Sequence, residues 1–120
     1  MHALETSRLL TEEYCAKILL GTMSRPRSAV ELSESLGIPI AACYRKIHAL
    51  EKAGFIVCVE KRLTQAGKRI AYYQSRIRIA EIIFEKGRVR ARVEMTDGTA
   101  EDYNYEFNIP KMVNFIGGAR

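Results

Sequence analysis

The chain of 120 residues lacks the features that mark membrane-spanning, secreted and disulfide-rich proteins. No apolar run approaches the roughly 20 residues that a membrane-spanning helix needs. The first ten residues lack the apolar segment of a secretory signal peptide. The three cysteines, Cys15, Cys43 and Cys58, are odd in number and far apart, which argues against a disulfide framework. We therefore expect a cytoplasmic protein with no membrane association.

Signatures of catalysis and of metal binding are absent as well. The only histidines are His2 and His48, and there is no phosphate-binding loop, nucleophile elbow or CxC or CxxC pair. We expect neither an enzyme nor a bound metal or cofactor. A thiol-based redox or metal sensor would need two cysteines within ligand distance, whereas we expect all three to be buried separately. His48 as a pH switch or metal ligand has no partner ligand in view.

Basic residues are present and concentrated in one part of the chain. The net charge is +5. Between residues 39 and 69, seven basic residues oppose two acidic ones, so this stretch accounts for the whole net charge. A localised positive face favours a polyanionic partner. The alternative is an ordinary solvated surface.

Helical spacing of apolar residues predicts three helices in the first half of the chain. The first spans residues 11–23 and has Glu12 and Glu13 in its first turn. The second begins at Ser28, which forms a capping box with Glu31, and ends at Gly37. We expect its apolar contacts to come from three residues, namely Val30, Leu32 and Leu36.

The third helix spans residues 39–53 and has two different faces. Pro39 suits its first turn, because the missing N–H would be unsatisfied there in any residue. Cys43, Ile47 and Leu50 share an apolar face, and we expect Cys43 to belong to the core. Polar and basic residues occupy the other positions. The short turn over residues 37–39 makes the last two helices a helix-turn-helix pattern.

A β-hairpin is predicted directly after these helices. Residues 55–60 are β-branched and apolar, residues 61–69 form a polar and basic tip, and residues 70–75 form the return strand. A helix-turn-helix followed by a hairpin with a basic tip is the winged-helix arrangement.

Residues 11–75 resemble the winged helix-turn-helix domain of ArsR-like bacterial and archaeal transcription regulators. The residues that carry the resemblance are Glu31-Leu32, Leu36-Gly37-Ile38, Tyr44-Arg45-Lys46-Ile47, Leu50 and Ala53-Gly54. The resemblance implies binding to double-stranded DNA as a homodimer. The CxC thiolate motif of the ArsR metal sensors is not present, and their C-terminal dimerisation helix is missing from the pattern. An effector is not identified.

In such an arrangement the helix over residues 39–53 would enter the major groove. Arg45 could reach guanine through two hydrogen bonds, while Tyr44 would contact a phosphate or a thymine methyl. Lys46, His48 and the wing would contact the backbone or minor groove, and Ser28 a phosphate. The candidate DNA-binding residues are therefore Ser28, Pro39, Ile40, Ala41, Tyr44, Arg45, Lys46, His48, Lys61, Arg62, Lys68 and Arg69. The alternatives are a half-buried Tyr44 and simple solvation of the basic residues.

The last third of the chain predicts a three-stranded antiparallel meander. Strict alternation over residues 88–95 and 102–109 gives each strand one apolar and one polar face. A two-residue loop at Lys86-Gly87 places Phe84 opposite Val89 and Glu81 opposite Arg92. A three-residue loop that ends at Gly98 keeps apolar faces together, with Ala91 opposite Tyr103 and Arg92 opposite Asp102. We expect these arginines to pair with carboxylates and not to contact DNA.

The predicted fold class is α+β, with a winged helix-turn-helix domain over residues 1–75 and a β-meander with its tail over residues 76–120. Ile77, Ile79 and Ile83 are predicted on the charged face of the meander, and the tail adds Met112, Val113, Phe115 and Ile116. We expect this region to form a dimer interface or an effector-binding surface. The alternative is that the tail covers the meander of its own chain.

The leading hypothesis for function is a sequence-specific, double-stranded DNA-binding transcriptional regulator. The alternative is a winged-helix protein–protein interaction module without sequence-specific DNA binding, because fold alone does not separate the two.

Overall fold

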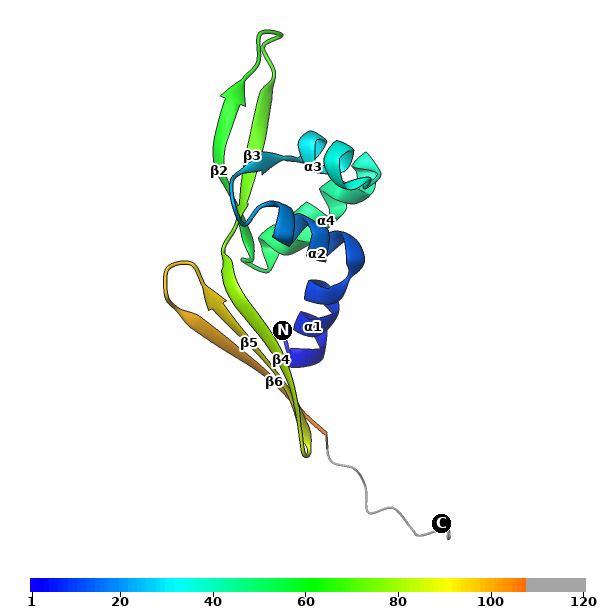
Figure 1. Ribbon diagram of the computed structural model, residues 1–120, viewed down its shortest axis with the longest axis vertical. Helices are drawn as coiled ribbons and strands as arrows, with labels where there is room; N and C mark the ends of the chain where they lie inside the picture. Colours follow the sequence, from blue (N-terminus) through cyan, green and yellow to red (C-terminus); the bar gives the residue numbers. More distant parts are fainter. Residues whose placement is uncertain (108–120) are drawn as a thin grey trace.

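A computed structural model describes residues 1–107 and shows an elongated α+β protein (Figure 1). Three of the four helices and a first sheet form the upper part of Figure 1, and a second sheet lies below them with the N-terminal helix beside it. None of the described helices has the length and apolar character needed to cross a membrane. The elements are α1 (Ala3–Thr11), α2 (Glu13–Gly21), β1 (Arg27–Ser28), α3 (Ala29–Leu36), α4 (Ile40–Lys52), β2 (Ile56–Leu63), β3 (Arg69–Ser75), β4 (Ile77–Glu85), β5 (Arg88–Met95) and β6 (Ala100–Glu106).

The N-terminal helix α1 was not predicted. His2 caps it, since its Nδ1 accepts the backbone N–H groups of Leu4 and Glu5, and the Glu5 carboxylate accepts the N–H of His2. Histidine is not among the usual N-cap residues, so this helix start is hard to recognise in the sequence. The helix expected over residues 11–23 begins at Glu13, because the Glu12 side chain acts as its N-cap.

The two helices of the helix-turn-helix have the predicted limits within a residue. The capping box is confirmed: Glu31 N–H donates to Ser28 Oγ, and Ser28 N–H donates to the Glu31 carboxylate. Gly37 ends α3 in the left-handed conformation, with φ of +68°. Pro39 is the N-cap of α4 and precedes its first turn. The prediction for Val30 was wrong, because Ala29 and Leu32 face the core and Val30 faces solvent.

The hairpin of β2 and β3 is longer than predicted. Its strands include Lys61, Arg62 and Arg69, so the turn is confined to residues 64–68. The short strand β1 pairs with β3, and a bulge at Val59 interrupts the register between β2 and β3. The wing, which is the hairpin of β2 and β3, is therefore a two-stranded arm with basic residues along its strands.

The meander has the predicted register along both of its strand pairs. Phe84 lies opposite Val89, Ala91 lies opposite Tyr103, and Arg92 lies opposite both Glu81 and Asp102. Gly98 has φ of +90°, as the three-residue loop requires. Ile77 was predicted on the charged face and is instead 3% exposed. A bulge at Arg78 is the reason, since the extra residue reverses the alternation of side chains along β4.

One hydrophobic core joins the upper and lower parts of the molecule. Phe55, at the start of the hairpin, is fully buried and meets the ring of Tyr103 edge-on, with ring centres 6.5 Å apart. Helix α1 packs against β5 and β6, and Val93 and Met95 belong to the same buried cluster as the helix-turn-helix residues. The predicted tail contacts of Met112, Val113, Phe115 and Ile116 lie outside the described residues.

The turn between α3 and α4 gives a test of this backbone. We expect Gly37→Ala to lower the free energy of unfolding by about 1 kcal/mol, because a Cβ disfavours positive φ. No neighbouring atom would meet the added Cβ, so the cost is conformational only. Urea titration should detect the loss, and Gly37→Asn should cost clearly less because asparagine tolerates the left-handed region. Equal losses for both variants would contradict this explanation.

Candidate nucleic-acid interface

Helix α4 presents one exposed face to solvent and one buried face to the core. Cys43, Ile47 and Leu50 are fully buried, as predicted. The opposite face carries most of the candidate residues of this helix, and all of them are exposed: Ile40, Ala41, Tyr44, Arg45 and His48. Their spacings of one, three and four residues place them on adjacent turns. Tyr44 is 43% exposed, so its ring is partly packed and its outer part is accessible.

Lys46 lies apart from this face and contacts helix α2. Its Nζ is 3.5 Å from the Glu12 carboxylate, which also caps α2. Burial raises the pKa of Glu12, but hydrogen bonds from the N–H groups of Tyr14 and Cys15, with the charge of Lys46, hold it below its usual value. The Lys46 charge is thus balanced within the protein, and Lys46 ties α4 to α2.

Ser28 and Pro39 differ in accessibility. Pro39 is exposed beside the first turn of α4, next to Ile40. Ser28 is buried at the start of α3, and its hydroxyl accepts the N–H of Glu31. This residue therefore fixes the position of the α3 N-terminus beneath the surface.

The wing carries its cations on two different faces. Lys61 lies opposite Ala71 in the register, so the two share the face on which Ala71 packs against the core. Arg62 lies on the other face, where its guanidinium carbon is 4.1 Å from the centre of the Tyr72 ring. Two hydrogen bonds of 2.9 and 3.1 Å join the same guanidinium to Glu60. Arg62 is therefore engaged within the hairpin.

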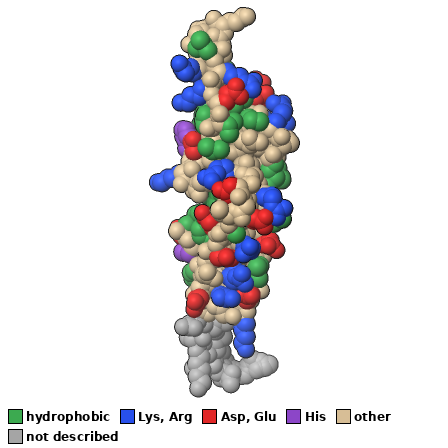
Figure 2. Space-filling model, turned by 90° about the vertical axis from the view of Figure 1, so that its left-hand side faces the viewer, with side chains coloured by type: hydrophobic (Ala, Val, Ile, Leu, Met, Phe, Trp, Pro, Cys, Tyr) green, Lys and Arg blue, Asp and Glu red, His purple; other side chains and the backbone are tan. Residues whose placement is uncertain are grey.

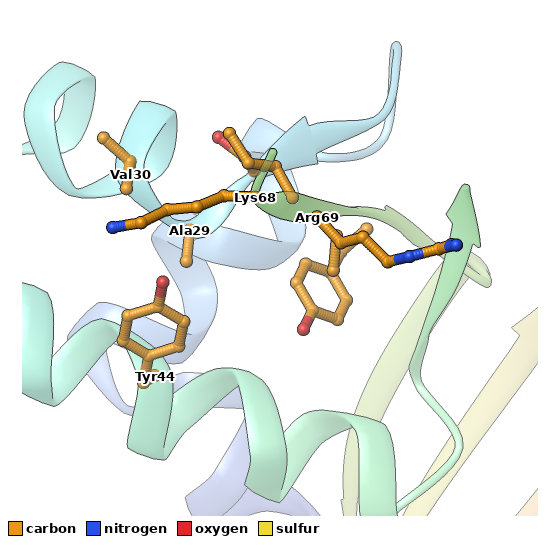
Figure 3. Close-up of a pocket in the computed structure, with 9 residues that line it drawn as sticks. Ala29, Val30, Tyr44, Lys68 and Arg69 are labelled. Carbon is orange, nitrogen blue, oxygen red and sulfur yellow. The ribbon is translucent and has the colours of Figure 1, made fainter. Parts of the chain in front are cut away.

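A pocket of about 360 Å³ separates the wing from the helices. Its walls are the start of α3, Tyr44 of α4 and residues 68–71 of the wing, with Tyr73 below. Figure 3 shows Lys68 extending over this pocket toward Val30 and Tyr44, whereas Arg69 extends away from Tyr44. Burial raises the pKa of Tyr73, so this residue is a neutral part of the wall. Of the two wing cations labelled in Figure 3, Lys68 is the one that extends toward the exposed face of α4.

Most of the cations that form no ion pair within residues 1–107 lie at the helix-turn-helix end of the molecule. Within residues 1–107, Arg45, Lys61, Lys68 and Arg69 form no ion pair, whereas the arginines of the meander do. Arg88 pairs with Glu85, and both Arg90 and Arg92 pair with Asp102. Figure 2 shows basic side chains on both sides of the narrow hairpin and mixed charges over the meander. The prediction of carboxylate partners for these arginines is confirmed.

The cysteines are not placed for joint chemistry in the described part of the chain. All three are free; Cys15 and Cys43 are buried, and Cys58 is half-buried, which corrects the expectation that all three would be buried. Burial, with the nearby Glu12 carboxylate, raises the pKa of Cys15 to about 11, and burial also raises that of Cys43. No group of three or more potential metal ligands occurs among residues 1–107.

Sequence reasoning missed two parts of this surface, Val30 and Tyr72. The spacing of Ala29, Leu32 and Leu36 by three and four residues marks the buried face of α3 and would have placed Val30 outside it. Tyr72 lies two residues from Ile70 on the return strand, and strand alternation alone would have placed it on the outer face beside Arg62.

Comparison with known proteins identifies one segment of this surface. Residues 10–59 match the family model described as a helix-turn-helix domain. The match covers α2, α3, α4 and the first residues of β2, and therefore includes the whole exposed face of α4. No curated protein matches the chain.

The thiols give a test of the burial around α4. At pH 8 we expect a disulfide reagent such as DTNB to modify Cys58 at least about 100-fold faster than Cys15 or Cys43, because raised pKa values and burial suppress the reactive thiolate. Mass mapping of the labelled chain would identify the site. Rapid labelling of Cys43 in the folded protein would contradict the packing of α4 described above.

Proposed function

We propose that this protein is a sequence-specific regulator of transcription that binds double-stranded DNA as a homodimer, in the manner of ArsR-like winged helix-turn-helix proteins. The observation that carries the proposal is the exposed face of α4 beside a wing in which Lys61, Lys68 and Arg69 have no ion-pair partner among residues 1–107. The helix-turn-helix match to residues 10–59 supports it, because such domains place their second helix in the major groove. Residues 1–75 would bind DNA, and residues 76–120 would provide dimerisation or an effector site.

The proposed readout divides the candidate residues by their position. Arg45 supplies the bidentate contact to guanine, while Ile40 and Ala41 contact thymine methyl groups near the start of α4. Tyr44 and His48 lie on the same exposed face and contact the adjacent bases or sugars. Pro39 packs beside the DNA at the helix start.

The wing residues supply affinity without sequence information. Lys61, Lys68 and Arg69 are exposed and have no ion-pair partner among the described residues, so their charges are available to phosphates. Lys46 and Arg62 contribute less, because Glu12 and Glu60 already neutralise them. Ser28 acts by holding the α3 N-terminus in place.

The first experiment is selection of bound duplexes from a random DNA pool at near-physiological salt. We expect a two-fold symmetric consensus, as a dimeric protein requires. Arg45→Ala should relax one position in each half-site and weaken binding by about 1–3 kcal/mol. Ala49→Ser, at an exposed position of α4 outside the candidate residues, controls for general damage to the helix. Enrichment of no sequence, with only weak salt-sensitive binding, would favour the protein-interaction module.

The wing is tested separately by the salt dependence of binding. We expect Lys68→Ala to weaken binding to consensus and non-consensus duplexes alike, and to reduce the slope of log K against log salt by about one. Arg62→Ala is the matched control, because its cation is paired with Glu60 and should change the slope less. An unchanged slope for Lys68→Ala, measured by fluorescence anisotropy across a salt series, would remove this residue from the interface.

A further inference from the structure

Strand β4 has the sequence of a central strand but lies at the edge of its sheet. The order of strands in the meander is β4-β5-β6, so within residues 1–107 β4 has a neighbouring strand on one side only. It is nine residues long and contains no proline or lysine, and five of its residues are isoleucine or phenylalanine. Its bulge lies near its start, at Arg78, and residues 79–85 are regular. Edge strands are normally short or interrupted by such residues, because an open edge pairs readily with another strand.

The open edge of β4 exposes backbone groups of alternate residues. Met95 N–H bonds to Thr99 O, and Phe107 N–H bonds to Gly87 O, so the odd-numbered residues of β5 and its turn face β6. The even-numbered residues of β5 therefore face β4, where they lie opposite Ile79, Glu81, Ile83 and Glu85. The N–H and C=O groups of Ala80, Ile82 and Phe84 consequently point to the open edge.

The side chains of this edge are apolar and uncovered. Phe84 is 79% exposed, the most exposed of the large hydrophobic residues described. At the other end of β4, Ala80 lines a pocket of about 260 Å³ together with residues of α1 and α2, Met23 and residues 77–79, among which Arg78 is the one charged residue. Leu20 and Met23, on the far wall, are 67% and 42% exposed. A small residue beside an apolar pocket thus lies four residues from an exposed aromatic ring.

We propose that this edge is the interface of the homodimer, in which β4 pairs antiparallel with β4 of a second copy across a two-fold axis at Ile82. The inference rests on the homodimer of the proposed function and specifies its surface. A two-fold interface must be self-complementary. An axis at Ile82 places Ala80 opposite the partner's Phe84, and the ring enters the apolar pocket beside Ala80.

Charge and register favour this alignment over its neighbours. When β4 pairs with β4 of the second copy, even-numbered residues must lie opposite even-numbered residues. Side chains alternate along the strand, so any other pairing would place the apolar face of one sheet beside the polar face of the other. An axis at Glu81 would oppose two carboxylates, and an axis at Ile83 would oppose Glu81 to the partner's Glu85. With the axis at Ile82, Glu81 faces the partner's Ile83 and Ile79 faces the partner's Glu85, so no like charges meet. The two meanders form one six-stranded sheet.

The interface is tested with the full chain in the absence of DNA. We expect wild-type protein at about 100 µM to sediment at twice the chain mass of 13.6 kDa. Phe84→Glu should raise the dimer dissociation constant at least about 100-fold, because two buried rings are lost and two carboxylates enter an apolar pocket. Leu63→Glu, an equivalent change at a wing residue that is 69% exposed, should leave the dimer intact.

A charge pair tests the register itself. Ala80→Lys alone should also weaken the dimer, whereas the double variant Ala80→Lys/Phe84→Glu places Lys opposite Glu twice and should dimerise about tenfold more tightly than either single variant. Circular dichroism and thermal melting should show all variants folded, since Ala80 and Phe84 are exposed in the single chain. Absence of rescue would overturn the register.

Two outcomes would overturn the interface as a whole: a wild-type chain that is monomeric at about 100 µM, or a Phe84→Glu chain that remains dimeric. Arg45→Ala separates this inference from the proposed function. That variant should relax the consensus and weaken DNA binding while it keeps the dimer mass, so failure of either proposal is seen in its own assay.

Discussion

The whole molecule depends on how one continuous run of chain, β3 followed by β4, is held at its midpoint. Arg76 lies between the two strands, and both of its backbone groups are used: its N–H donates to Phe55 O at 2.8 Å, and its C=O accepts the Thr96 N–H at 2.8 Å. Ser75 N–H donates to Thr22 O at the end of α2. The wing, the helices and the meander are therefore fixed to each other at one point. Phe55 fills the core beside it.

Charge placement follows from this arrangement. The arginines of the meander form ion pairs with carboxylates of the same sheet or its turns. At the helix-turn-helix end, Glu12 and Glu60 neutralise Lys46 and Arg62, whereas four cations of α4 and the wing form no ion pair among residues 1–107, namely Arg45, Lys61, Lys68 and Arg69. A net charge of +5 is thus gathered where a polyanion would be bound.

The sequence contained most of the fold because its local signals were strong. Three local signals each favour one conformation: the capping box at Ser28 a helix start, the glycine after Leu36 a helix end, and the alternation of residues 88–95 a strand. The pleat then determines the register of the meander. Helix α1 was missed because its cap is a histidine. Ile77 was misplaced because a bulge leaves no mark in composition or periodicity.

The candidate site was predictable as a set of exposed positions but not as a set of available charges. Periodicity places Arg45 and Lys46 side by side on α4. Only the packing of α2 shows that Lys46 meets Glu12, while Arg45 meets no carboxylate among residues 1–107. The same holds in the wing, where Arg62 lies over Tyr72 and Lys68 extends over the pocket. Such distinctions depend on contacts between segments far apart in the chain.

The bulge at Arg78 lies in the continuous run of β3 and β4, and the side chains before and after it alternate in opposite senses. Before it, the odd-numbered residues Tyr73, Ser75 and Ile77 are buried; after it, Ala80 and Ile82 lie on the apolar side opposite buried Val93 and Ala91. The single extra residue shifts the alternation of side chains by one position. It therefore joins two sequence patterns that are each regular. A chain that lost this residue would keep both patterns intact. Its meander would nevertheless turn its arginines toward α1 and its valines toward water, so the length of this segment is as constrained as any residue in the core.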